Sequence, residues 1–191
     1  DSSDKDNDLI ECTSSLVEEL LLRCPADEDI TRAIVESVPI EGGHLLFSMH
    51  AMAALWSEHS FVRKASKRSS SCLTSGILAG LARLGSSGQF SGGDDPSKAW
   101  GDNPSKAPFL YSHGPRGVSL LMSLSQGVGQ YLDSADQTAR LGGMRVACSF
   151  SALTGHDLSF PELIEVEEKE EKEEKEEKEE KERRKLRKSA V

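Results

Sequence analysis

Apolar residues recur at intervals of three and four along most of the chain up to residue 164, and this spacing is typical of amphipathic α-helices. Short interruptions rich in Pro, Gly, Ser or Asp separate the apolar segments. The pattern therefore predicts helices near residues 9–24, 27–38, 44–56, 70–85, 118–132 and 135–154.

Residues with known preferences for helix ends mark the borders of these segments. Pro25 and Pro39 each end a helix, and Asp27 can accept a hydrogen bond from a free backbone N–H at the start of the second helix. Ser134 and Gln137 form an S-x-x-Q capping box, which predicts a fresh helix start after residue 134. Short connections of this kind place neighbouring helices antiparallel to one another.

Each predicted helix carries one apolar stripe, which we expect to be buried against a neighbour. In chain order these stripes are Leu9, Ile10, Leu16, Val17, Leu20, Leu21 and Cys24; Ile30, Ala33, Ile34 and Val38; Leu45, Met49, Met52, Ala53 and Trp56; Leu73, Ile77, Leu81 and Leu84; Leu121, Met122, Val128 and Leu132; and Leu141, Met144, Val146, Cys148 and Leu153. We therefore predict an all-α fold, an alpha-solenoid of antiparallel, HEAT-like helix pairs, with a compact helical bundle as the alternative.

Other stretches interrupt the two sets of helical repeats, which we assign to residues 8–84 and 118–164. Residues 1–7 are acidic and are expected to be disordered. Residues 85–117 are rich in Gly, Ser, Pro and Asp, repeat P-S-K-A at Pro96 and Pro104, and are expected to form an insertion or mobile loop. The stretch "HDLSFPELIE" is expected to be extended. Residues 165–191 repeat Glu and Lys without an apolar seam, which predicts a solvated helical tail rather than a coiled coil.

Four glycines lie within the last two predicted helices, where glycine lowers helix stability. Gly127 and Gly129 read G-x-G, but the third glycine of a dinucleotide-binding motif would stand at Leu132 and no strand precedes it. We therefore expect Gly127 and Gly129 to let two helices approach closely. Gly142 and Gly143 are expected to do the same or to bend their helix.

The charge of the chain argues against a general nucleic-acid-binding protein. Its 32 Asp and Glu residues exceed its 23 Lys and Arg residues, for a formal net charge of −9, whereas phosphate contacts need clustered cations. The basic stretch "RRKLRK" could serve as a nuclear import signal. Ser3, beside Asp4, could be phosphorylated by an acidophilic kinase, although a solvated tail is the simpler interpretation.

No motif for catalysis, a metal or a cofactor emerges, and we expect none of these functions and hence no catalytic, cofactor-binding or metal site residues. Gly80 and Gly85 are followed by Ser86, where a phosphate-binding loop needs Lys, and neither G-x-S-x-G nor H-E-x-x-H occurs. The five histidines are His44, His50, His59, His113 and His156, and none has a cysteine partner at zinc spacing. The four cysteines, Cys12, Cys24, Cys72 and Cys148, lack C-x-x-C spacing and are expected to be reduced and buried.

Several stretches together resemble the telomere length regulation protein family, the scaffold of the TTT co-chaperone complex. The resemblance runs through "ALWSEHSFVRKAS", "LTSGILAGLARLG", "LLMSLSQGVGQYLDSADQTARLGGMRVACSFSAL" and "DLSFPELIE". The family pattern corresponds to Gly127, Val128, Leu132, Asp133 and Ser134, then Arg140, Gly143, Met144, Val146 and Ala147. The chain departs from this pattern at the 85–117 insertion, at Cys148 and in the charged tail.

This resemblance implies a non-enzymatic role for one internal section of a longer protein. Its implied partners are the other TTT subunits, phosphatidylinositol-3-kinase-related kinases, the heat-shock chaperone and the RuvB-like ATPases, in the cytoplasm and nucleus, with links to telomere maintenance and DNA-damage signalling. Arg140 or Arg145 could meet an acidic partner, or both could be ordinary surface charges. The alternatives are a telomere- or nucleic-acid-associated helical factor, or a structural helical-repeat domain. Direct nucleic-acid binding and membrane association are not expected.

Overall fold

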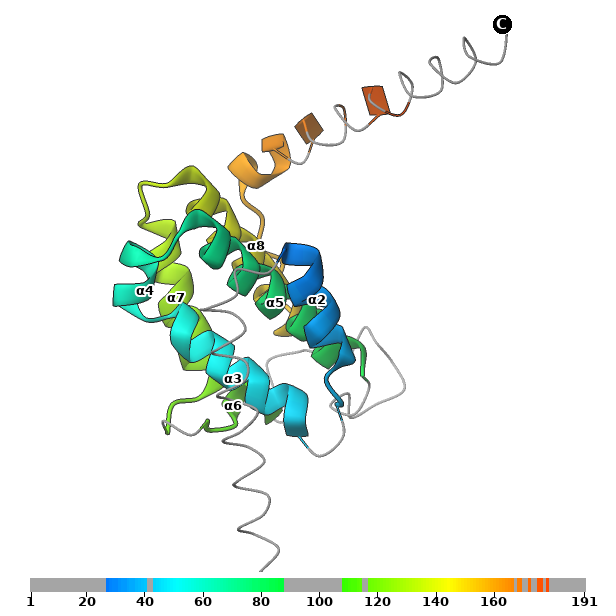
Figure 1. Cartoon of the computed structure of the whole chain (residues 1–191), viewed down its shortest axis with the longest axis vertical. Helices are drawn as coiled ribbons and strands as arrows, with labels where there is room; N and C mark the ends of the chain where they lie inside the picture. The colour runs from blue at the N-terminus through cyan, green and yellow to red at the C-terminus, as the bar shows by residue number, and fades with distance from the viewer. Residues whose placement is uncertain are drawn as a thin grey trace, which may run out of the picture. The chain divides into compact units, whose positions relative to one another are not determined.

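The computed structural model describes residues 27–40, 43–87, 108–114 and 117–166, together with residues 168–169, 172, 175–176 and 178 of the Glu/Lys run. These residues fall into two compact units, one ending at Leu158 and the other beginning at Ser159. The first unit contains helices α2 (Glu28–Ser37), α3 (His44–Trp56), α4 (His59–Lys64), α5 (Lys67–Ser86), α6 (Pro108–Tyr111), α7 (Leu120–Leu132) and α8 (Gln137–Leu153) (Figure 1). The described residues contain no strand beyond one isolated antiparallel bridge between His113 and Ser119, so the all-α prediction is confirmed for them.

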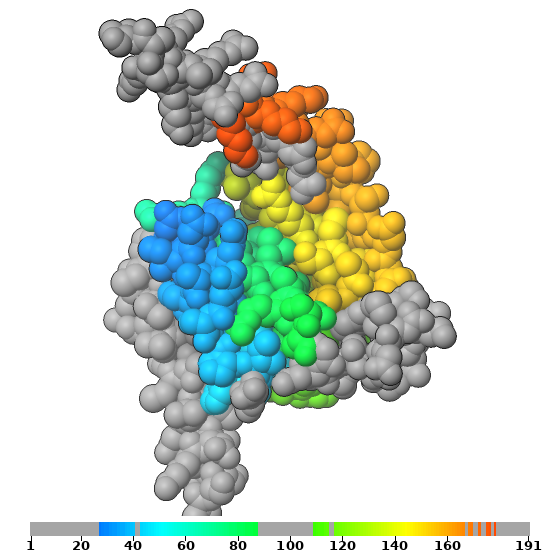
Figure 2. All heavy atoms as spheres, turned by 90° about the vertical axis from the view of Figure 1, so that its right-hand side faces the viewer, coloured from blue at the N-terminus to red at the C-terminus, as the bar shows by residue number. Residues whose placement is uncertain are grey.

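The long helices of the first unit lie in two rows. Helices α2, α5 and α8 lie side by side in that order, which Figure 2 shows from one face. Helices α3 and α7 form the second row: α3 packs on α5, α7 packs on α8, and α3 and α7 contact each other. The short α4 contacts α3 and α7, and α6 packs against α7. Helices α3, α5, α7 and α8 therefore each have a neighbour within their row and another across the two rows.

Side chains at the helix starts explain where the helices begin. Asp27 accepts a hydrogen bond from the backbone of Asp29, which confirms its predicted role as the N-cap of α2. The predicted capping box was wrong by two residues, because the carboxylate of Asp136 caps α8 by accepting from the backbone N–H of Ala139. Ser134 instead accepts from the backbone N–H of Asp136 and shapes the turn before the helix.

The core is centred on the side chain of Trp56, which is fully buried at the end of α3. Its ring stacks on that of Tyr131 from α7, with centroids 4.4 Å apart and an interplanar angle of 15°. Its indole N–H donates to Thr74 Oγ1 of α5 at 3.1 Å. One aromatic side chain thus joins three helices, and its polar atom is satisfied inside the core.

The predicted buried faces were right for α3 and α5 and shifted for α2 and α7. All predicted stripe residues of α3 and α5 are buried. In α2, Thr31 and Val35 are buried and Ile30 is 54% exposed, and in α7 the buried residues include Leu124 while Met122 is 62% exposed. The stripe of α8 is buried at Met144 and Val146 and half-buried at Leu141, Cys148 and Leu153.

Three connecting segments also differ from the prediction. The connector between α3 and α5 contains the short helix α4. Within the segment expected to be a structureless insertion, Phe109 and Leu110 of α6 are completely buried in the core. Residues 161–166, in the second unit, are helical rather than extended, whereas the preceding residues 156–160 have no regular structure. The burial of Phe109 and Leu110 removes apolar surface from water, which offsets the entropy lost when α6 is ordered.

Several predictions concern residues outside the described ones. These are the acidic segment 1–7 with Ser3, the helix at 9–24 with Cys12 and Cys24, most of the 85–117 insertion with both P-S-K-A repeats, and the basic stretch "RRKLRK". The described residues of the Glu/Lys run are helical, and Glu168, Lys169, Lys172, Lys175, Glu176 and Lys178 are exposed, as a solvated helix requires.

The glycines of α7 and α8 separate into two kinds. A Cβ at Gly127 would lie 2.2 Å from a ring carbon of Trp56, and one at Gly143 would lie 2.6 Å from Cβ of Tyr131. Close helix approach is thus confirmed at these two residues, and at Gly142 the nearest atom, from Thr74, would lie at 3.3 Å. The prediction was wrong at Gly129, where a Cβ would meet nothing within 4 Å.

This difference gives a matched test within one helix. We expect Gly127→Ala to lower the free energy of unfolding by about 1–3 kcal/mol, because the added methyl group overlaps a fixed aromatic ring. Gly129→Ala, two residues away in the same helix, should raise it by about 0.5–1 kcal/mol through helix propensity. Urea unfolding followed by circular dichroism measures both values, and equal effects of the two substitutions would contradict this packing.

His50 is a buried titratable side chain that joins α3 to the segment 108–114. Ser112 donates its hydroxyl proton to the carbonyl of Phe109 at 2.6 Å, so the 2.9 Å contact between His50 Nε2 and Ser112 Oγ requires the proton on Nε2. His50 Nδ1 is buried with no hydrogen-bond partner among the described residues. Burial, and secondarily the nearby charge of His113, lowers the pKa of His50.

A lowered pKa makes the fold sensitive to acid. Below the ordinary histidine pKa of 6.5 the unfolded chain takes up a proton at residue 50 before the folded chain does, so stability falls as the pH drops towards the folded pKa. We expect thermal melting temperatures to decrease between neutral pH and about pH 5, and His50→Gln to reduce that decrease because its amide keeps a donor without titrating. An unchanged pH profile in this variant would contradict the assignment.

Candidate functional site

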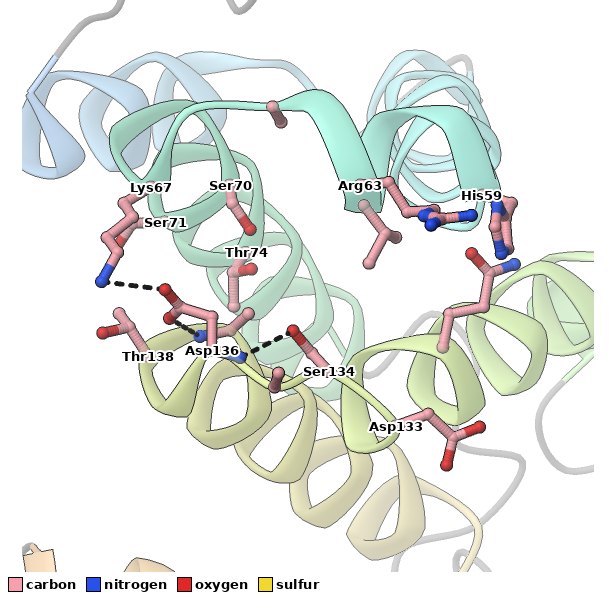
Figure 3. A pocket seen from close by; sticks show the side chains of 15 residues that line it. His59, Arg63, Lys67, Ser70, Ser71, Thr74, Asp133, Ser134, Asp136 and Thr138 are labelled. Atoms are coloured by element: carbon pink, nitrogen blue, oxygen red, sulfur yellow. Dashed lines mark hydrogen bonds and ion pairs between the residues drawn. The ribbon is translucent and has the colours of Figure 1, made fainter.

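A polar groove of about 720 Å³ opens between the α4–α5 corner and the α7–α8 corner (Figure 3). One wall carries His59 and Arg63 of α4 and Lys67 at the start of α5. The facing wall carries Asp133 after α7 and Asp136 before α8. Hydroxyl groups lie between them, from Ser70, Ser71, Thr74, Ser134 and Thr138. The groove therefore presents cations, carboxylates and hydroxyls together.

An ion pair spans one end of the groove, as Figure 3 shows. Lys67 Nζ lies 2.8 Å from Asp136 Oδ2, while the other carboxylate oxygen of Asp136 accepts from the N–H of Ala139 at 3.2 Å. The hydrogen bond from Lys67, followed by that from the backbone of Ala139, lowers the pKa of Asp136. The lysine side chain is 77% exposed, so the pair is screened by water and can exchange for other partners.

The floor of the groove is attached to the buried core. Ser70 donates to the hydroxyl of Tyr131 at 3.0 Å, and Thr74 accepts from the indole of Trp56. Burial raises the pKa of Tyr131 to about 12, against the opposing effect of the Ser70 hydrogen bond. Gln130, another lining residue, donates to the carbonyl of Ser57 at 2.7 Å, and its buried Oε1 has no hydrogen-bond partner among the described residues. These bonds fix the floor, whereas the charged rim stays exchangeable.

The side chains that line the groove offer charges and hydrogen-bonding groups. Arg63, Lys67 and Asp133 are exposed, and several of the hydroxyls bond residues on other helices, an arrangement that suits hydrogen bonds and ion pairs with a polar partner. Among the described residues, no group of three or more His, Cys, Asp or Glu side chains could hold a metal ion. No helix in the described part of the chain is long and apolar enough to cross a membrane.

The residues singled out in the sequence lie mostly around this groove rather than in it. Arg140 donates to the carbonyl of Ser134 at 3.4 Å and closes the α7–α8 turn, while Arg145 is half-buried on α8. Of the two described cysteines, Cys72 is buried, as predicted, and Cys148 is half-buried; neither forms a disulfide. Only Asp133 and Ser134 of the family pattern line the groove.

Sequence reasoning missed the rest of the groove. Its basic wall comes from the short helix α4, which the apolar pattern did not predict, and its acidic wall comes from the turn that positions Asp136. The signal that could have revealed the basic wall is the run "RKASKR" at residues 63–68, which places four cations at the end of α4 and the start of α5.

Three comparisons of the chain with known proteins found no similar protein. No protein-family model matches the chain, and neither a curated protein nor a solved structure matches it significantly.

The two bonds of Asp136 can be separated by substitution. We expect Asp136→Ala to lower the melting temperature more than Asp136→Asn, because the amide keeps an oxygen for the Ala139 N–H and loses only the ion pair. Lys67→Met should resemble Asp136→Asn, since it also removes the ion pair alone. Thermal unfolding at low and high salt compares them. An Asn variant as damaging as the Ala variant would show that the ion pair, rather than the cap, sustains the turn.

Proposed function

We propose that this chain is a section of a non-enzymatic helical scaffold of the TTT complex, supporting the chaperone-dependent maturation and stability of phosphatidylinositol-3-kinase-related kinases. In this role it holds partner proteins and performs no chemistry on them. Its partners would be the other TTT subunits, the kinases, the heat-shock chaperone and the RuvB-like ATPases, as the family resemblance implies.

The observation that carries the proposal is the location of the residues that resemble the family. Trp56 comes from the first resembling stretch, and Gly127 and Gly143 come from the third. These residues are packing partners: the ring of Trp56 fills the space that Gly127 leaves open, and Gly143 lies against Tyr131. Residues that allow close helix packing are what a scaffold of stacked helices needs, and this supports the assignment.

The order of the helices supports the proposed solenoid. Along the chain, α3 of one row is followed by α5 of the other, and α7 is followed by α8. Each of these pairs packs together, and the pairs contact each other through both rows. Repetition of such helix pairs generates a solenoid, whose stacked corners form an extended binding surface. The polar groove lies at the corners of two successive pairs, so we propose it as a partner-binding surface.

An affinity experiment tests this function. We expect the tagged chain, expressed in cultured human cells, to recover the other TTT subunits and the giant kinases. Arg63→Glu, which reverses a charge in the groove, should reduce their recovery several-fold. Arg32→Glu is the matched control on α2, because it reverses a 53% exposed arginine that does not line the groove. Quantitative mass spectrometry measures recovery.

Two outcomes would contradict the proposal. Recovery of none of these proteins by a well-expressed, folded chain would leave only a structural helical domain. A submicromolar Kd for duplex DNA in fluorescence anisotropy at physiological salt would favour the nucleic-acid-associated alternative. Equal recovery by the Arg63→Glu and Arg32→Glu variants would remove the groove from the binding surface while leaving the scaffold role intact.

A further inference from the structure

We propose that Ser66 is a phosphorylation site for a serine kinase that selects arginine upstream of its target. Ser66 lies in the two-residue connection between α4 and α5 and is exposed. Arg63 stands three residues before it and Lys64 two residues before it, and both are exposed. No Asp or Glu occurs from residue 59 to residue 71. The site therefore offers an accessible hydroxyl within a wholly cationic stretch.

Charge complementarity identifies this class of kinase. A kinase of this class presents carboxylates to the residues that precede the target serine, and a guanidinium pairs with carboxylates through two parallel hydrogen bonds. No ion pair or hydrogen bond of the Arg63 side chain occurs among the described residues, so a kinase need not displace one to engage it. The same cationic stretch would be repelled by a kinase that selects acidic substrates.

The structure distinguishes Ser66 from the serines that follow it. Ser70 and Ser71 also have cations two or three residues before them, so the sequence alone does not choose. Both lie inside α5 and are half-buried: Ser70 donates to the hydroxyl of Tyr131, and Ser71 donates to Glu28. Phosphorylating either would break a contact between helices. Within the described part of the chain, the Ser66 side chain makes only local hydrogen bonds, to the backbone N–H and the hydroxyl of Ser69.

Local opening can deliver Ser66 to a kinase in extended form. The six residues of α4 include no buried residue, and the first buried residue of α5 is Cys72. A helix of this length has little stability of its own. Unfolding α4 and the first turn of α5 exposes the half-buried side chains of Phe61 and Val62, which pack against the core, and none of the fully buried core residues.

The reaction and its consequence follow from these positions. Ser66 Oγ attacks the γ-phosphorus of Mg²⁺-bound ATP, the bond to the β-phosphate oxygen breaks to release ADP, and the hydroxyl proton passes to the kinase's catalytic aspartate. The phosphate adds about 1.5 to 2 negative charges at neutral pH. Ala65 and Lys67 on either side of Ser66 line the groove, so this charge appears at its rim and competes with Asp136 for Lys67. The modification does not depend on the proposed function, although it would regulate that groove.

Phosphorylation of the purified, folded chain tests the inference. We use the catalytic subunit of cyclic-AMP-dependent protein kinase with radiolabelled ATP and Mg²⁺, and locate the phosphate by mass spectrometry. Labelling should occur at Ser66 and be lost in Ser66→Ala. Arg63→Gln should lower kcat/KM roughly tenfold or more, the effect of losing one charge-assisted contact. Arg32→Gln, the matched substitution on α2, should leave it unchanged.

The heat-denatured chain is the second control. Without helix α5 it should be labelled at Ser70 or Ser71 as well as at Ser66, because their hydroxyls are then free. The inference is overturned if the folded chain is not labelled, if label falls on Ser70 or Ser71 alone, or if Ser66→Ala is labelled as rapidly as the unchanged chain. Each of these readouts uses the isolated chain, so it is independent of whether the TTT partners bind.

Discussion

The contact between the indole of Trp56 and the bare backbone at Gly127 sets the spacing between α3 and α7. No other residue type leaves room for the ring there, since even a methyl group would fall 2.2 Å from it. The ring then stacks on Tyr131, one turn further along α7, and donates to Thr74 on α5. The contacts of this one side chain therefore fix the positions of helices in both rows. Because the core is closely packed, a small change at residue 127 affects much of it.

The same contact explains why the polar groove lies where it does. Tyr131 accepts a hydrogen bond from the groove residue Ser70, and Thr74, itself a groove residue, accepts one from the indole of Trp56. Beyond this fixed layer, the charged side chains of the groove come from α4, from the first residue of α5 and from the α7–α8 turn, and all but the half-buried Asp136 are exposed. A rigid floor with a variable rim allows surface chemistry to change without altering the packing beneath it.

Much of the helical pattern could be predicted from the sequence, because leucine, methionine and isoleucine at helical spacing lie on one face of a helix, and burying that face removes them from water. This held for Leu45 to Trp56 and for Leu73 to Leu84. It failed in α2 and α7, where small or polar residues such as Thr31 and Gly127 face the core and large ones such as Met122 do not. The groove could not be predicted, since its walls meet only after α4 and α8 have packed against different helices. Periodicity carries no information about such long-range neighbours.

Arg83 shows how the end of one helix can depend on another. Its guanidinium reaches from α5 and donates to the carbonyl oxygens of Val35 and Val38, at 2.7 Å and 2.6 Å, where α2 stops. The terminal carbonyls of a helix are otherwise left to solvent or to a local cap. Here the charged guanidinium of a neighbouring helix supplies their hydrogen bonds. Fraying of the end of α2 would leave the guanidinium of Arg83 without these two acceptors. The opening of α2 is therefore coupled to that of α5. Amide hydrogen exchange would then register α2 and the last turn of α5 as one cooperative unit.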